Sequence, residues 1–234
     1  MTFTPVHLFL LLMANWPRAK RLVDWAVSVL KLDEDGRAER WRLNEAARIL
    51  RPAESLVRRM LVILACQRLL SDPPALAASP ARAGQRNQSA DGPVRPPFLT
   101  FSLLDPALSF RTEPPAPRPT VWPSIWSPGQ VRVENLDVTG PDPLERIDAA
   151  GFLARAKRLA AALADPDPFT ARLARWLSRA RAAPPHEIRR RLPIRPAGYI
   201  PGRHSAALDS VNRSSLTYTH WGAEAALSGL WNSS

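Results

Sequence analysis

Cysteine and histidine are scarce in this chain, and the shortage limits the chemistry that it can perform. One cysteine, Cys66, stands among 234 residues. An internal disulfide framework is therefore excluded, and a reducing compartment fits. Cys66 lies in an apolar stretch, where a buried structural thiol is expected rather than a nucleophile. The four histidines are scattered along the chain, so no metal site is predicted. They are His7, His186, His204 and His220.

Long apolar runs are also missing. The run Val6–Trp16 would reach about 16 Å as a helix, roughly half the thickness of a bilayer's hydrocarbon core. It has neither a basic segment before it nor a small-residue cleavage site after it, so no signal peptide is expected. Because Arg18, Lys20 and Arg21 follow directly, an anchor at an anionic membrane surface stays open. Packing against a core helix is the simpler prediction for the same residues.

Sequence motifs of catalysis are absent as well. The chain has no GxGxxG, no GxxxxGK[ST] and no GxSxG. Nothing places its Ser, His and Asp residues together, and no cofactor or small-molecule substrate is evident. We therefore predict that the protein is not an enzyme.

Arginine, proline and tryptophan are abundant instead. The chain has 25 prolines, 8 tryptophans, and 32 lysines and arginines, of which only three are lysine. A formal charge of +11 indicates a polyanionic partner, either nucleic acid or anionic lipid. Coding bias is the competing explanation, because GC-rich DNA favours Arg, Ala and Pro over Lys. A protein partner also fits, so the composition leaves the partner open.

The segment Pro52–Leu70 is the predicted centre of the fold. Pro52 suits a first helical position, since its missing N–H costs nothing there. Apolar residues recur at helical spacing and widen into a broad face, and the segment is too short to cross a bilayer. Another part of the chain must cover this face. We predict that the N-terminal helices and a late pair of helices share one core.

Four segments are predicted along the chain. Residues 1–70 read as three or four short helices with breaks at Pro17, at Asp33–Gly36 and before Pro52. Residues 71–140 hold 13 prolines and form a connector that we expect to be partly disordered. Residues 141–204 form a basic helical hairpin with an arginine-rich tail, and residues 205–234 are weakly helical.

The predicted fold class follows from these segments. It is mostly α, a small helical core with a proline-rich connector and at most one short strand pair. Within the connector, Phe98–Leu104 is apolar enough to lie on the core. Val131–Glu134 is the best strand candidate because its side chains alternate.

The arginines of the late segment are the candidate binding site. Arg172, Arg175 and Arg179 recur at i, i+3 and i+7, so they share one side of a helix whose other side is apolar. Arg189, Arg190 and Arg191 extend the positive charge, and Tyr199 is placed to stack on a base. The planar guanidinium of arginine can donate two hydrogen bonds to the oxygens of one phosphate. This predicts binding to a nucleic-acid backbone with little dependence on base sequence.

Four blocks of the sequence resemble an Arg- and Pro-rich family of bacterial proteins. They read RPAESLVRRMLVILA, FSLLDP, ARLARWLSRA and RPAGYIPGR. The resemblance implies a bacterial protein of the cytoplasm. It implies no activity, cofactor or site residue.

Overall fold

The described part of the protein is helical apart from one strand pair. The computed structural model describes residues 3–71, 103, 142–182, 193–194 and 200–232. Their helices are α1 (Pro5–Val29), α2 (Arg40–Ser71), α3 (Ala150–Ala164), α4 (Asp167–Arg181) and α6 (Ser210–Asn232). The strands are β1 (Arg37–Glu39) and β2 (Arg146–Asp148), which pair antiparallel. The predicted fold class, mostly α with one short strand pair, is confirmed.

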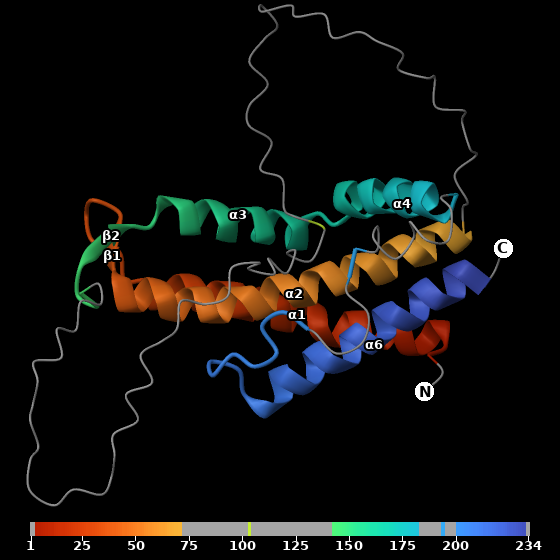
Figure 1. Ribbon diagram of the computed structural model, residues 1–234, viewed down its shortest axis with the longest axis horizontal. Coiled ribbons are helices and arrows are strands. Elements are labelled where there is room, and N and C mark those ends of the chain that lie inside the picture. Colours follow the sequence, from red (N-terminus) through yellow and green to blue (C-terminus); the bar gives the residue numbers. More distant parts are fainter. Residues whose placement is uncertain (1–2, 72–102, 104–141, 183–192, 195–199, 233–234) are drawn as a thin grey trace, which may run out of the picture.

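Helix α2 is the centre of the molecule (Figure 1). Helices α3 and α4 follow one another along one side of α2, and α6 runs along another side. Helix α1 also packs on α2. Every residue from Pro52 to Ile63 is buried, so this stretch of α2 has no solvent-facing side. The predicted centre of the fold is therefore correct, but it is surrounded by helices rather than covered on one face.

Two predicted helix breaks are wrong, because both prolines lie inside continuous helices. Pro17 lies within α1 and Pro52 within α2. An interior proline removes the hydrogen bond to the carbonyl four residues earlier, a loss of about 3 kcal/mol or more. Pro17 is exposed, and packing of the opposite face of α1 on α2 keeps the helix continuous. At Pro52 another segment replaces the lost bond, as described below.

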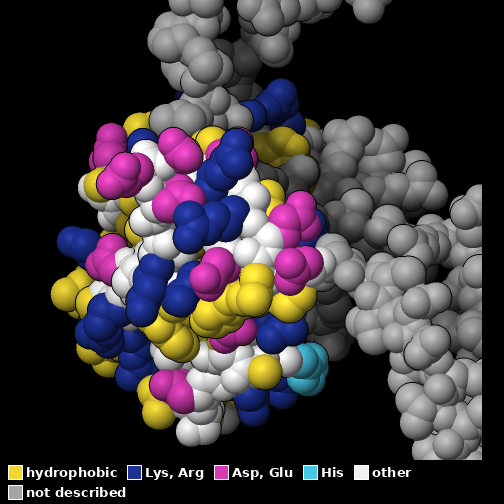
Figure 2. Space-filling view, turned by 90° about the vertical axis from the view of Figure 1, so that its left-hand side faces the viewer, with side chains coloured by type: hydrophobic (Ala, Val, Ile, Leu, Met, Phe, Trp, Pro, Cys, Tyr) yellow, Lys and Arg dark blue, Asp and Glu magenta, His cyan; other side chains and the backbone are white. Residues whose placement is uncertain are grey.

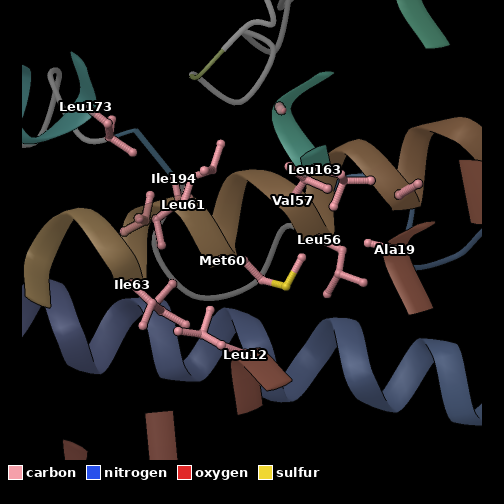
Figure 3. Close-up of a cluster of buried hydrophobic side chains, with 14 of the residues drawn as sticks. Leu12, Ala19, Leu56, Val57, Met60, Leu61, Ile63, Leu163, Leu173 and Ile194 are labelled. Carbon is pink, nitrogen blue, oxygen red and sulfur yellow. The ribbon is translucent and has the colours of Figure 1, made fainter. Parts of the chain in front are cut away.

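One hydrophobic core unites all five described helices, which confirms that the N-terminal and late helices share a core. Figure 3 shows Met60, Leu61 and Ile63 of α2 reaching into this core, with Leu12 near Ile63. Leu173 and Leu163 bring α4 and α3 into the same cluster. Leu103 also packs against it as a partly buried residue. Burial of each large apolar side chain contributes about 1.5–3 kcal/mol, which is why the central stretch of α2 is so rich in them.

The late helices differ from the predicted hairpin in arrangement. The apolar faces are as expected, since Leu159 and Leu163 of α3 and Leu173 and Leu177 of α4 are buried. However, α3 and α4 each pack on α2 and follow one another along it (Figure 1). The α3 start is stabilised by Asp148, whose carboxylate accepts the Ala150 N–H at 2.8 Å.

The C-terminal segment forms a long helix despite its weak pattern. Gly222 lies where α6 meets α1, and a Cβ there would come within 3.3 Å of the Leu8 and Leu11 side chains. The glycine therefore permits the close approach of the two helices. Ser71, the first residue of the predicted connector, ends α2. The rest of that connector, including the strand candidate at 131–134, lies outside the described residues apart from Leu103.

The strand pair joins two distant parts of the chain. Ala38 pairs with Ile147, and an ion pair links Arg40 to Glu145. Arg146 contacts Asp33 at 3.1 Å. The turn predicted at Asp33–Gly36 is present, with Gly36 at a φ of 74° that suits glycine. This ribbon holds the start of α2 beside the start of α3.

Candidate nucleic-acid interface and an arginine-lined pocket

The three predicted arginines of α4 form an exposed ridge. Thr170, Leu173, Ala174, Leu177 and Ala180 of this helix are buried against the rest of the protein. Arg172, Arg175 and Arg179 lie within about 60° of one another on the side directly opposite. All three are exposed. The structure thus brings together three predicted site residues, and we call them the α4 ridge.

The arginines of the α4 ridge differ from those at the strand end of the molecule in whether they have carboxylate partners. At that end basic and acidic side chains are interspersed (Figure 2), and Arg42 contacts Glu39 at 2.7 Å. The hydrogen bond from Arg42 lowers the pKa of the Glu39 carboxyl below its usual value. Among the described residues, by contrast, no carboxylate pairs with an arginine of the α4 ridge. Within the described part of the chain, the one side-chain hydrogen bond of the ridge runs from Arg179 Nε to the Arg175 carbonyl at 3.3 Å.

The remaining predicted site residues are not placed. Arg189, Arg190, Arg191 and Tyr199 lie outside the described residues. The extension of the ridge beyond α4 therefore stays a prediction.

Helix α1 is apolar on two opposite sides at its N-terminal end. Leu8 and Leu12 are buried in the shared core, as the simpler prediction required. The outer side of the same turns carries large apolar side chains with exposed fractions of 57–65%. They are Val6, Phe9, Leu10 and Met13, which we call the α1 outer face. Lys20 and Arg21 are exposed farther along the helix.

A pocket that the sequence analysis missed lies over Pro52. Since Pro52 has no N–H, the Arg48 carbonyl loses its helical partner. The Ser205 hydroxyl donates to that carbonyl at 2.8 Å and replaces the bond. Gly202 lies so close that a Cβ would be 2.7 Å from the Pro52 nitrogen, and its φ of 82° also favours glycine. The proline thus fixes residues 200–205 against α2.

This loop, α2 and α3 enclose an arginine-lined pocket of about 560 Å³. Four arginines line it, namely Arg48, Arg51, Arg58 and Arg155. Glu54 is buried at its base and accepts two hydrogen bonds from Arg155, one of them from Nη2 at 2.6 Å. Arg58 Nη2 donates to the same carboxylate at 3.3 Å. The bond to Glu54 raises the pKa of the Arg155 guanidinium above its ordinary value.

The spacing of four charged residues in the sequence could have indicated the pocket. Arg48, Arg51, Glu54 and Arg58 share one side of α2 once that helix is continuous through Pro52. A break at Pro52 separates the first two from the others and hides the pattern. Arg155 and the loop could not be assigned to the site from spacing alone.

A second buried polar group links α2 to α6. Arg59 is fully buried, and its Nε donates to His220 Nδ1 at 3.0 Å. Its Nη1 donates to the Ser55 hydroxyl at 2.6 Å and to the Ser55 carbonyl at 2.9 Å. Because His220 accepts at Nδ1, its ring proton is on Nε2, which faces Glu224 Oε1 at 3.4 Å. These contacts hold two helices together within the core.

The described residues offer little other chemistry. They contain no group of three or more His, Cys, Asp or Glu side chains suited to a metal ion. Burial raises the pKa of the Cys66 thiol to about 12, so this thiol is not a ready nucleophile. None of the described helices combines the length and apolar character needed to span a bilayer.

Comparison with protein-family models, with curated proteins and with solved structures finds no match to this chain. The resemblance to a bacterial family, and the cytoplasmic location that it implies, therefore stay predictions.

Proposed function

We propose that this protein is a non-enzymatic binding protein that contacts the phosphate backbone of nucleic acid through the α4 ridge. The observation that carries the proposal is the set of three exposed arginines opposite the packed face of α4. Arginines with a structural role usually have a carboxylate or carbonyl partner. Arg172 and Arg175 lack a side-chain partner among the described residues. Their guanidinium groups are available to an anion from outside.

The dimensions of the α4 ridge suit a polyanion. Arg172 and Arg179 are seven residues apart, which separates them by about 10 Å along the helix axis. Over this length one nucleic-acid strand presents several phosphates. Each guanidinium can donate two parallel hydrogen bonds to a phosphate. Contacts to phosphate carry no sequence information, so we expect binding through these contacts to be sequence-tolerant.

Filter binding at low salt tests the proposal. The variant replaces Arg172, Arg175 and Arg179 by Gln and should bind duplex DNA and RNA more weakly than the original protein. Helix α4 should still fold, because all three side chains are exposed. A matched control replaces three exposed and dispersed arginines, Arg21, Arg37 and Arg68, by Gln.

Comparing the two variants distinguishes binding at a local site from a general effect of net charge. Both lose three positive charges, so an effect of net charge would weaken binding equally in both. A larger loss in the α4 variant supports the α4 ridge. If the original protein retains no DNA or RNA at micromolar concentration, the nucleic-acid proposal is wrong.

A membrane surface is the second candidate partner, and the α1 outer face favours it. Four large apolar side chains at i, i+3, i+4 and i+7 are exposed there, an arrangement typical of interfacial helices. Lys20 and Arg21 supply nearby positive charge for anionic headgroups. Leu8 and Leu12 take no part, since both are buried in the core.

Co-sedimentation with lipid vesicles tests this second candidate. The protein should sediment with vesicles rich in phosphatidylglycerol and less with vesicles of phosphatidylcholine alone. Replacing Phe9 and Met13 by Ser should abolish sedimentation without unfolding, because both side chains are exposed. Concentration-dependent dimers that disappear in this variant would instead assign the α1 outer face to contact between copies of the chain.

A further inference from the structure

We propose that a groove between α1 and α6 binds a single-chain amphiphile, an acyl chain whose head carries an acidic group and an N–H donor. The volume of this α1–α6 groove is about 690 Å³, within the range of roughly 300–1,000 Å³ that small-molecule sites occupy. The groove shares no lining residue with the arginine-lined pocket or with the α4 ridge. The inference therefore does not depend on nucleic-acid binding.

One part of the α1–α6 groove is apolar and suits an alkyl chain. It is lined by Phe3, just before α1, and by Leu10, Leu11 and Ala14 of α1. Phe3 and Leu11 also pack against the shared core, which fixes this wall in place. Leu10 and Ala14 are exposed, so the wall is open to a ligand from solvent. Each methylene group of an alkyl chain that is buried here favours binding.

The other part of the groove carries a positive charge. Arg18 lies one turn of α1 beyond Ala14, and its Nη1 donates to the buried Ser215 hydroxyl of α6. No carboxylate of the described residues pairs with Arg18. Ser215 therefore orients the guanidinium without neutralising it. The other N–H groups of Arg18 can donate to the carboxylate of a ligand.

Asn15 adds a preference for a ligand with a hydrogen-bond donor. It lines the groove three residues before Arg18, so the two side chains are neighbours on the helix surface. Asn15 is only 4% exposed, and its Nδ2 donates to the Leu11 carbonyl at 2.8 Å. Its Oδ1 is buried and accepts no hydrogen bond from the described residues, which is costly. An N-acyl amino acid has an N–H one carbon away from its carboxylate, and so matches Asn15 and Arg18 together.

Isothermal titration of the full chain tests the proposal, with N-octanoylglycine as the probe below the concentration at which it forms micelles. Saturable binding of one equivalent is expected. Arg18→Gln should weaken binding of this probe about tenfold or more, because the ion pair with the carboxylate is lost. Binding of the neutral N-octanoylglycinamide should change less than about threefold in the same variant. N-octanoylsarcosine, which lacks the N–H, should bind several-fold more weakly than N-octanoylglycine.

Two further variants locate the binding. Ala14→Trp fills the groove at an exposed position and should abolish binding of both octanoylglycine probes without unfolding α1. The control Arg21→Gln removes an exposed arginine of the same helix outside the groove, and should change affinity less than about twofold. The variant with Gln at all three positions of the α4 ridge should bind the probe normally, which distinguishes this site from the nucleic-acid proposal.

The absence of saturable binding at about 10 mM N-octanoylglycine would overturn the proposal. Unchanged binding in Ala14→Trp would overturn it, and so would equal weakening of the acidic and neutral probes in Arg18→Gln, since Arg18 would then act only on the structure. Vesicle co-sedimentation identifies the natural source of the amphiphile once the probe binds. Loss of sedimentation in Ala14→Trp assigns the groove to a bilayer lipid, whereas unchanged sedimentation assigns it to a dissolved acyl acid.

Discussion

Single residues decide the close contacts of this protein, and the clearest case is Gly202. Its positive φ and the short approach to Pro52 leave no room for a side chain. Gly151 offers a comparison, because a Cβ there meets nothing within 4 Å and the residue lies in helix α3. The two glycines therefore have opposite predicted responses to the same substitution.

We predict that Gly202→Ala destabilises the protein by about 2 kcal/mol or more, through backbone strain and contact with Pro52. Gly151→Ala should stabilise it by about 0.5–1 kcal/mol, since alanine loses less entropy in a helix. Urea unfolding of both variants measures the difference. Equal effects of the same sign would contradict the assigned packing of the loop.

The buried thiol of Cys66 gives a prediction for pH. Burial raises its folded pKa to about 12, above the ordinary value of 9.0. Its contribution to stability is therefore complete below about pH 9 and is lost as the pH rises toward 12. The difference in unfolding free energy between the original protein and Cys66→Ala should shrink over that range. A constant difference from pH 7 to pH 11 would show that the thiol titrates normally when folded.

At the scale of elements, the two interior prolines show what sequence patterns can predict and what they cannot. Apolar spacing predicts the central helix, the faces of α3 and α4, and the ridge of arginines, because each depends on residues within a few turns. The continuity of α2 depends on Ser205, a residue 157 positions from Arg48. No local pattern contains that partner. The same long-range contact hides the arginine-lined pocket from a reading of the sequence.

A double-mutant cycle tests the role of Ser205. Ser205→Ala should cost about 0.5–1.5 kcal/mol, the net value of one hydrogen bond. In a Pro52→Ala background the helix regains its own N–H donor to the Arg48 carbonyl, so the cost should fall toward zero. Equal costs in both backgrounds would mean that Ser205 does not replace the missing bond.

The apolar run of α1 shows another limit of local pattern. The run predicts a buried helix, and one side of it is buried in the core. The opposite side is equally apolar and exposed. Hydropathy cannot separate these two sides, because both lie in the same turns and carry similar residues. Only the position of α2 and α6 decides which side is covered.

At the scale of the whole molecule, one core should give one unfolding transition. Leu61 of α2 and Leu177 of α4 are both fully buried in the same cluster, although far apart in the sequence. Each change to Ala should cost about 2–5 kcal/mol and shift a single transition seen equally by circular dichroism and by tryptophan fluorescence. Leu64→Ala, at a half-buried position, should cost less. Two separate transitions, with only one shifted by each variant, would show independent units.

Among the described residues, arginines in different parts of the molecule differ in their ion pairing. At the strand end Arg40, Arg42 and Arg146 pair with carboxylates, whereas the α4 ridge has no acidic partner among the described residues. Coding bias would supply arginines to both places alike.

The salt dependence of DNA affinity is the most direct measurement of the proposed function. Each phosphate that is neutralised on a duplex contributes about 0.9 to the slope of log affinity against log salt. Replacing Arg172, Arg175 and Arg179 by Gln should therefore reduce that slope by about 2–3, with little dependence on DNA sequence. An unchanged slope in this variant, in a protein that still binds DNA, would contradict contact through the α4 ridge.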